Sequence, residues 1–116
     1  MIFAYCNYLF RNKKYKELLD IIYKYNAEEE CGEFLGELYY QGLGLPQDYN
    51  KAFALFKKYY ENNPNSYSIM YRLGVCYFFA QGVAENKELA KELIYKSKSA
   101  KVKEAEIFWK EWFSKK

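Results

Sequence analysis

LGELYYQGLGLPQDYNKA, residues 35–52, contains the signals from which the architecture of this chain can be predicted. An apolar and aromatic run ends at Gly42, and a polar residue, Asp48, follows a short break. Gly44 can adopt a positive φ and turn the chain, and Pro46 cannot continue a helix. The side-chain oxygen of Asp48 can cap a new helix. The stretch therefore predicts a helix, a corner and a second helix.

The same outline returns thirty-eight residues later as LGVCYFFAQGVAENKELA, residues 73–90. Gly36 and its counterpart Gly74 have no side chain, so a neighbouring helix can approach them closely. Ala52 and its counterpart Ala90 stand where the second helix would pack against the first. The recurrence predicts a repeated helix–loop–helix unit.

The remaining segments extend this scheme over all 116 residues. Residues 1–26 indicate a degenerate helix pair with a tight link at residues 12–14. Two full repeats follow in residues 27–63 and 65–101. We expect residues 102–116 to contain one capping helix, whose polar tail would shield the open end of a helical stack. The sequence therefore predicts a single all-α domain, a short α-solenoid of about three helix–loop–helix repeats plus a C-terminal capping helix.

The middle of the chain resembles the Sel1-like repeat, a relative of the tetratricopeptide repeat, with the pattern A-x-x-x-L-G-x-x-Y-x-x-G-x-G-V-x-x-D-x-x-K-A. The residues that carry this resemblance are Cys31, Leu35, Gly36, Tyr39, Gly42, Gly44, Leu45, Asp48, Lys51 and Ala52. Residues 69–101 resemble a weaker copy, in which Ala80 replaces the first loop glycine and Asn86 the aspartate. The resemblance implies a right-handed α-solenoid that binds proteins and has no catalysis of its own.

The composition excludes most kinds of active site. The chain has no histidine, which removes Ser-His-Asp and Cys-His nucleophilic sites and imidazole metal ligands. The loop at residues 42–44 lacks the Lys-Ser/Thr of a phosphate-binding loop and follows a helix rather than a strand. We therefore expect no catalytic residue, no metal and no cofactor.

Acidic side chains are densest just before the quoted stretch. They are Glu28, Glu29, Glu30 and Glu33. We expect them in the first turn of a helix that begins near Ala27, where negative charges are favoured by the helix dipole. A structural role is therefore preferred over acid–base catalysis.

Cysteine usage and hydropathy indicate a cytoplasmic protein. Cys6, Cys31 and Cys76 are odd in number and widely spaced, which argues against a disulfide framework or a zinc site and favours three small buried hydrophobes in a reducing compartment. No apolar run approaches the roughly 20 residues that span a bilayer. The N-terminus lacks the basic region and cleavage site of a secretory signal.

Candidate binding residues lie on the first helix of each unit, because these helices line the concave side of a helical stack. Tyr, Trp and Arg dominate the binding energy of protein interfaces. The positions that we expect outside the core are Glu33, Glu37, Tyr40, Gln41, Tyr71, Arg72, Val75, Phe79, Glu111 and Trp112. For Val75 and Phe79, packing between helices is an equal alternative.

The short, self-sufficient chain predicts a protein that binds one partner protein, as a monomer or weak dimer. A bacterial inhibitor or immunity protein that neutralises a toxin is the most concrete form of this hypothesis. A general adaptor or scaffold is the alternative. A third hypothesis, binding of single-stranded RNA, depends on the basic group Lys96, Lys98, Lys101 and Lys103. We prefer a solvated linker between two helices as the explanation of that group.

Overall fold

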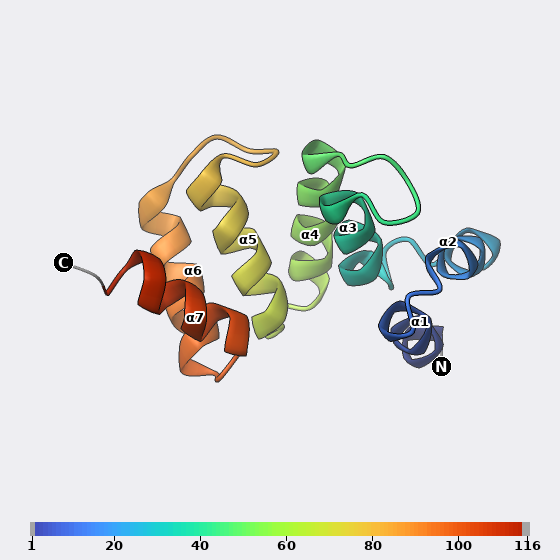
Figure 1. Ribbon diagram of the computed structural model, residues 1–116, viewed down its shortest axis with the longest axis horizontal. Helices are drawn as coiled ribbons and strands as arrows, with labels where there is room; N and C mark the ends of the chain where they lie inside the picture. Colours follow the sequence, from blue (N-terminus) through green and yellow to red (C-terminus); the bar gives the residue numbers. More distant parts are fainter. Residues whose placement is uncertain (1, 115–116) are drawn as a thin grey trace. The chain divides into compact units, whose positions relative to one another are not determined.

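The computed structural model describes residues 2–114. This part of the chain consists of seven α-helices joined by turns and short loops, without a strand (Figure 1). The helices are α1 (Ile2–Arg11), α2 (Tyr15–Lys24), α3 (Gly32–Gln41), α4 (Tyr49–Asn62), α5 (Tyr67–Phe79), α6 (Lys87–Ser99) and α7 (Lys103–Trp112). The predicted all-α class is thereby confirmed. The chain divides into two compact units. The first ends at Tyr59 and the second begins at Tyr60, so the boundary falls within α4.

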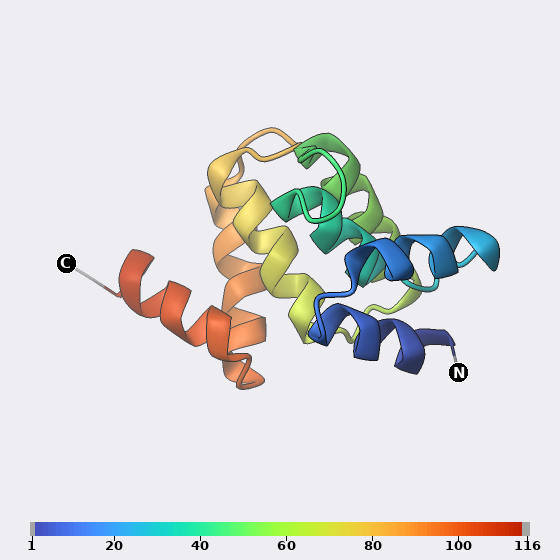
Figure 2. The same ribbon diagram turned by 45° about the vertical axis from the view of Figure 1, so that its right-hand side comes forward.

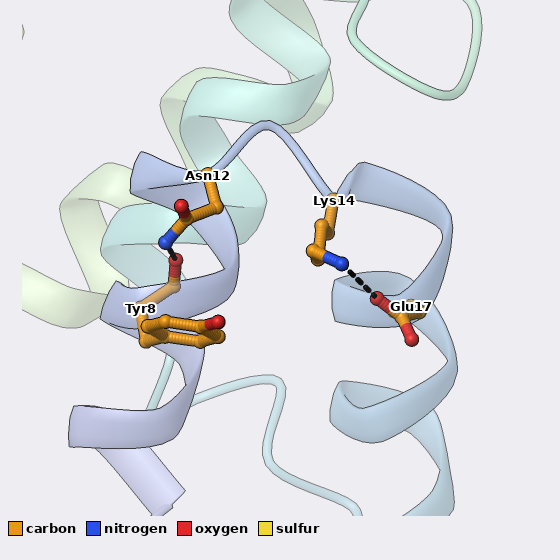
Figure 3. Close-up of polar contacts among 4 residues, drawn as sticks. All are labelled: Tyr8, Asn12, Lys14 and Glu17. Carbon is orange, nitrogen blue, oxygen red and sulfur yellow. Dashed lines mark hydrogen bonds and ion pairs between the residues drawn. The ribbon is translucent and has the colours of Figure 1, made fainter.

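The first unit opens with the short helices α1 and α2, and Figure 3 shows how they are linked. Asn12 Nδ2 donates a hydrogen bond to the carbonyl oxygen of Tyr8 (2.8 Å) and so occupies an acceptor at the end of α1. Lys13 then takes a φ of 60° and turns the chain. Lys14 Nζ lies 4.0 Å from Glu17 Oε1, an exposed ion pair of the kind that adds little stability.

A glycine lets α3 and α4 pack closely. A Cβ atom at Gly36 would lie 2.5 Å from Cε1 of Phe56, far inside ordinary contact distance. The loop between the helices begins at Gly42, in the left-handed conformation with a φ of 71°. It ends where Asp48 Oδ1 accepts a hydrogen bond from the backbone N–H of Lys51 (3.1 Å). The predicted corner between two helices is therefore confirmed.

The start of α3 differs from the prediction. We expected a helix from near Ala27, with the acids at residues 28–30 in its first turn, but α3 begins at Gly32. Residues 28–31 instead form the turns that reverse the chain, with the N–H of Cys31 bonded to the carbonyl of Ala27 (2.8 Å). Of the four acids, Glu33 alone lies in the first helical turn.

Apolar side chains from α1, α2 and α3 form the core of the first unit. Phe34 lies at its edge, with its ring centroid 4.9 Å from Phe3 and 5.7 Å from Phe10. The buried members of this core are Cys6, Leu9, Leu18, Ile22, Ala27, Cys31, Phe34, Leu35 and Leu38. The small thiols of two cysteines thus fill the space between α1 and α3.

In the second unit, α5, α6 and α7 follow one another in yellow, orange and red (Figure 2). A Cβ atom at Gly74 would lie 2.5 Å from Cγ1 of Ile94, so α5 and α6 repeat the close approach of α3 and α4. Asn86 Oδ1 accepts a hydrogen bond from the N–H of Leu89 (3.0 Å) and caps α6. Ala80 takes the left-handed conformation, with a φ of 56°, at the position where the first repeat has Gly42.

The second unit also encloses one polar side chain. Ser97 is fully buried, and its Oγ donates a hydrogen bond to the carbonyl oxygen of Tyr67 (2.7 Å). This bond connects the end of α6 to the start of α5. The apolar buried residues of this unit are Ile69, Met70, Leu73, Val75, Cys76, Phe78, Ala90, Leu93, Ile94, Ala105 and Phe108.

Candidate protein-binding surface

Four of the predicted binding residues share one helix of the first unit. They are Glu33, Glu37, Tyr40 and Gln41, all on α3. Gln41 is exposed and donates a hydrogen bond from Nε2 to Glu37 Oε2, and the other three are half-buried. The ring centroid of Tyr40 lies 5.2 Å from Tyr49 and 6.2 Å from Phe56. Tyr40 therefore packs against α4 and keeps part of its side chain accessible.

Aromatic side chains gather in the second unit where the C-terminal ends of α5 and α7 meet. We name this group the aromatic cluster, and its members are Phe78, Phe79, Phe108, Trp112 and Phe113. Phe78 and Phe108 form its buried base, with ring centroids 5.4 Å apart in an edge-on arrangement. Phe79 and Trp112 lie on the outside, 43% and 50% exposed.

The two exposed rings of the cluster are in contact with each other. The centroids of Phe79 and Trp112 are 5.5 Å apart, with ring planes nearly perpendicular at 85°. Phe78 supports both rings from below, at 5.0 Å from Phe79 and 5.4 Å from Trp112. Edge-to-face contacts of this kind hold the rings in place before any partner arrives. The cluster therefore presents a preformed apolar surface.

Tyr71 and Arg72 flank the cluster. The Tyr71 ring lies 6.3 Å from Phe108, and the guanidinium carbon of Arg72 lies 5.3 Å from the Tyr71 ring centroid. Both side chains are half-buried, whereas Glu111 on α7 is exposed. Val75 is only 4% exposed and packs inside the protein. Its side chain therefore takes the packing role that the sequence left open, and it does not contribute to an accessible surface.

The four lysines of the basic group, Lys96, Lys98, Lys101 and Lys103, have three different environments. Lys96 Nζ pairs with Glu92 Oε2 at 3.6 Å. Lys98 Nζ lies 5.2 Å from the ring centroid of Tyr95 and 5.5 Å from that of Trp109. Lys101 and Lys103 lie at the turn between α6 and α7 and at the first residue of α7. The structure thus brings one lysine of the group onto a pair of aromatic rings.

The groups with shifted pKa values are thiols and phenols, and burial is the main cause in each case. Burial and the contact with Cys6 raise the pKa of Cys31 to about 12, and burial also raises the pKa of Cys6. Burial and a hydrogen bond with Tyr39 raise the pKa of Tyr23 to about 12. These groups stay protonated at neutral pH, so they supply no activated nucleophile.

Two further properties of residues 2–114 bear on the site. Within this range, no three Cys, Asp or Glu side chains gather in a way that could hold a metal ion. None of the helices α1 to α7 has the length and hydropathy that a membrane-spanning segment needs.

Two successive helix pairs, α3–α4 and α5–α6, each pack around a buried glycine and are each joined by a loop that ends at a capping residue. This repetition of one helix–loop–helix unit is the arrangement of an α-helical repeat protein. The Sel1 repeat family matches residues 33–63 and 70–101, more than half of the chain. The protein belongs to the Sel1 repeat family. Repeats of this family mediate protein–protein interactions, and their proteins are typically non-catalytic adaptors.

A solved structure has the same fold. The crystal structure of a Sel1 repeat protein from Oxalobacter formigenes matches with a TM-score of 0.74 and 21% sequence identity, over 90% of this chain and 43% of that chain. This match confirms the predicted α-solenoid class. The chain spans less than half the length of that relative. No curated protein sequence matches the chain.

The sequence predicted the two exposed rings of the aromatic cluster but not the aromatic rings that pack beneath them. Phe79 and Trp112 were candidates, but Phe78, Phe108 and Phe113 were not. One signal was available, because residues 108 and 112 are spaced i, i+4 and must share a helix face. The contact of Phe78 with α7 had no such signal, since it depends on how successive helices pack.

Proposed function

We propose that this protein is a non-catalytic binding module that holds one partner protein through the aromatic cluster of its second unit. The observation that carries the proposal is the contact between Phe79 and Trp112, both about half exposed, over a buried base of aromatic rings. Large aromatic side chains in fixed positions supply much of the binding energy at protein interfaces. Membership of the Sel1 repeat family supports the same role.

Charged side chains beside the aromatic cluster could make specific polar contacts with the partner. Arg72 stacks beside Tyr71, which contacts the base of the cluster, and Glu111 lies exposed on α7. A partner that buries Trp112 would therefore meet a cation and a carboxylate at the rim. Glu33, Glu37, Tyr40 and Gln41 on α3 are proposed as additional contacts of the first unit.

In its more specific form, the proposal is an inhibitor or immunity protein that neutralises a toxin in the bacterial cytoplasm, as a monomer or weak dimer and without a cofactor. A general adaptor or scaffold is the alternative. The two forms differ in stoichiometry and effect. An inhibitor forms a one-to-one complex with an enzyme whose activity falls on binding, whereas an adaptor captures several partners and leaves their activities unchanged.

The test is capture of partners from cells that carry the gene, using the unaltered protein and the double variant Phe79→Ala, Trp112→Ala. We expect the partner to bind the double variant at least about tenfold more weakly, because central aromatic residues each contribute more than about 1 kcal/mol. Tyr8→Ala is the matched control, since Tyr8 is 54% exposed but lies on α1. Equal capture by the double variant and the unaltered protein would reject the cluster as the binding surface.

One observation favours a second candidate, binding of single-stranded RNA. Lys98 lies over the rings of Tyr95 and Trp109, and aromatic rings beside cations can stack unpaired bases. Binding of a labelled RNA oligonucleotide at low salt, weakened by salt and by changing Lys96, Lys98, Lys101 and Lys103 to Ala, would support this candidate. Absence of binding at low salt removes it.

A further inference from the structure

Two cysteines that are far apart in the sequence meet in the core of the first unit. The Sγ atoms of Cys6 and Cys31 are 3.3 Å apart, and the Cys31 thiol donates to the Cys6 sulfur. Both side chains are fully buried. They come from different elements, because Cys6 lies within α1 and Cys31 immediately precedes α3. The contact therefore connects two helices that α2 separates along the chain.

The backbone around this contact is held in place. The N–H of Cys31 bonds to the carbonyl of Ala27 (2.8 Å), and its own carbonyl accepts a bond from the N–H of Leu35 (2.9 Å). Cys6 lies within a helix and shares the core with Leu9. A disulfide has an S–S distance of about 2.05 Å, so the two sulfurs need to approach by little more than 1 Å. Rotation about the side-chain bonds can supply part of this movement.

We propose that Cys6 and Cys31 form a dithiol–disulfide site, which a low-molecular-weight disulfide such as oxidised glutathione converts into a covalent link between α1 and the start of α3. One thiolate attacks the glutathione disulfide and releases one reduced glutathione. The second thiolate then attacks the mixed disulfide and releases another. The two cysteines lose their thiol protons and are oxidised together, while one molecule of oxidised glutathione is reduced to two thiols.

Burial sets the rate of this reaction. The raised pKa values of both thiols keep the thiolate scarce while the first unit is closed. The oxidant reaches the sulfurs when α1 moves away from α3, and re-closure brings the second thiol to the mixed disulfide. Once formed, the disulfide is enclosed by the same core, so a reductant reaches it as slowly as the oxidant reaches the two thiols. The site therefore responds to sustained oxidation, and the loop that it closes contains the whole of α2.

Intact mass spectrometry after alkylation under denaturing conditions tests this site. The reduced chain has three free cysteines and takes up three alkyl groups. After prolonged incubation with oxidised glutathione, we expect one alkyl group, on Cys76, and a peptide map that joins Cys6 to Cys31. We also expect the midpoint of thermal unfolding to rise by roughly 10 °C, because the link restricts the unfolded chain. Adding dithiothreitol should reverse both changes.

Variants in which one cysteine is replaced make the test specific. Cys76→Ala should still form the link and then take up no alkyl group. Cys31→Ala, which introduces the alanine of the repeat pattern at this position, should take up two alkyl groups or carry glutathione, and its unfolding midpoint should not rise. A chain that retains three alkylatable thiols, that stops at mixed disulfides with glutathione, or that links Cys76 instead would overturn the proposal.

Discussion

Replacing Gly74 by alanine tests how the helices of each repeat are held together. A Cβ atom at this position would lie 2.5 Å from Cγ1 of Ile94, whereas ordinary contacts begin at 3.4 Å. It would also lie 3.2 Å from the carbonyl oxygen of Ala90. The Ile94 side chain could rotate away, but the carbonyl belongs to the backbone of α6 and cannot. The added methyl group must therefore push α5 and α6 apart.

The size of the effect follows from two opposing contributions. Alanine is favoured over glycine by about 1 kcal/mol in a helix interior. An extra methyl group in a well-packed contact costs about 1–3 kcal/mol. The 2.5 Å contact with Cγ1 of Ile94, added to the fixed carbonyl, places Gly74→Ala in the upper half of that range. We therefore expect a net loss of about 1–2 kcal/mol in the free energy of unfolding. This loss lowers the unfolding midpoint by roughly 5–10 °C.

Circular dichroism at 222 nm, a wavelength that reports helix content, measures this change during heating. Gly32→Ala is the matched control, because a Cβ atom there would also meet a backbone carbonyl oxygen, that of Leu55 at 3.3 Å, but no side-chain atom closer than 3.4 Å. It should therefore lose less stability than Gly74→Ala. Adding Ile94→Ala should relieve part of the clash, so that the double variant is more stable than the sum of the single losses predicts by about 1 kcal/mol. An unchanged or higher midpoint for Gly74→Ala would refute the reasoning.

Three further predictions concern local features. Asn86→Ala should lower the free energy of unfolding by about 1 kcal/mol in urea titrations, because the cap on the N–H of Leu89 is lost; Asn86→Ser should restore most of it. Ala80→Gly should raise the thermal midpoint, because alanine pays about 1 kcal/mol in the left-handed conformation that Ala80 occupies, and a lower midpoint would contradict this. The pKa of Cys31 is raised from 9.0 in the unfolded chain to about 12 in the folded protein, so under reducing conditions stability should be full below pH 9.0 and fall as the pH rises toward 12. Urea midpoints on either side of pH 9.0 should show this decline, and Cys31→Ala should make it shallower.

The repeat could be predicted from the sequence because its signals are local. Gly36 and Gly74 mark a close approach, and Asp48 and Asn86 mark the start of a helix, whatever the rest of the chain does. The start of α3 was predicted too early for the same reason. Acids at residues 28–30 suit a helix N-terminus, but the reversal after α2 uses those residues for turns.

The candidate site was predicted less completely because its contacts join separate helices. The exposure of Phe79 and Trp112 could be proposed from their positions on helix faces. Their support by Phe78 depends on the angle at which α5 and α7 pack, which no local pattern encodes. The contact of Cys6 with Cys31 is of the same kind, since the wide spacing of the cysteines gave no sign that two of them would meet.

The tryptophans of α7 also give the protein an intrinsic fluorescence probe. Both tryptophans of the chain, Trp109 and Trp112, lie on this helix. Trp109 is half-buried with Lys91 and Lys98 near its ring, whereas Trp112 is half exposed at the aromatic cluster. Tryptophan emission therefore reports on the last helix of the second unit. Excitation at the long-wavelength edge of the tryptophan absorption band avoids exciting the many tyrosines of the rest of the chain. In a Trp109→Phe variant, a shift of the remaining emission to shorter wavelengths would signal that a bound molecule has removed water from Trp112.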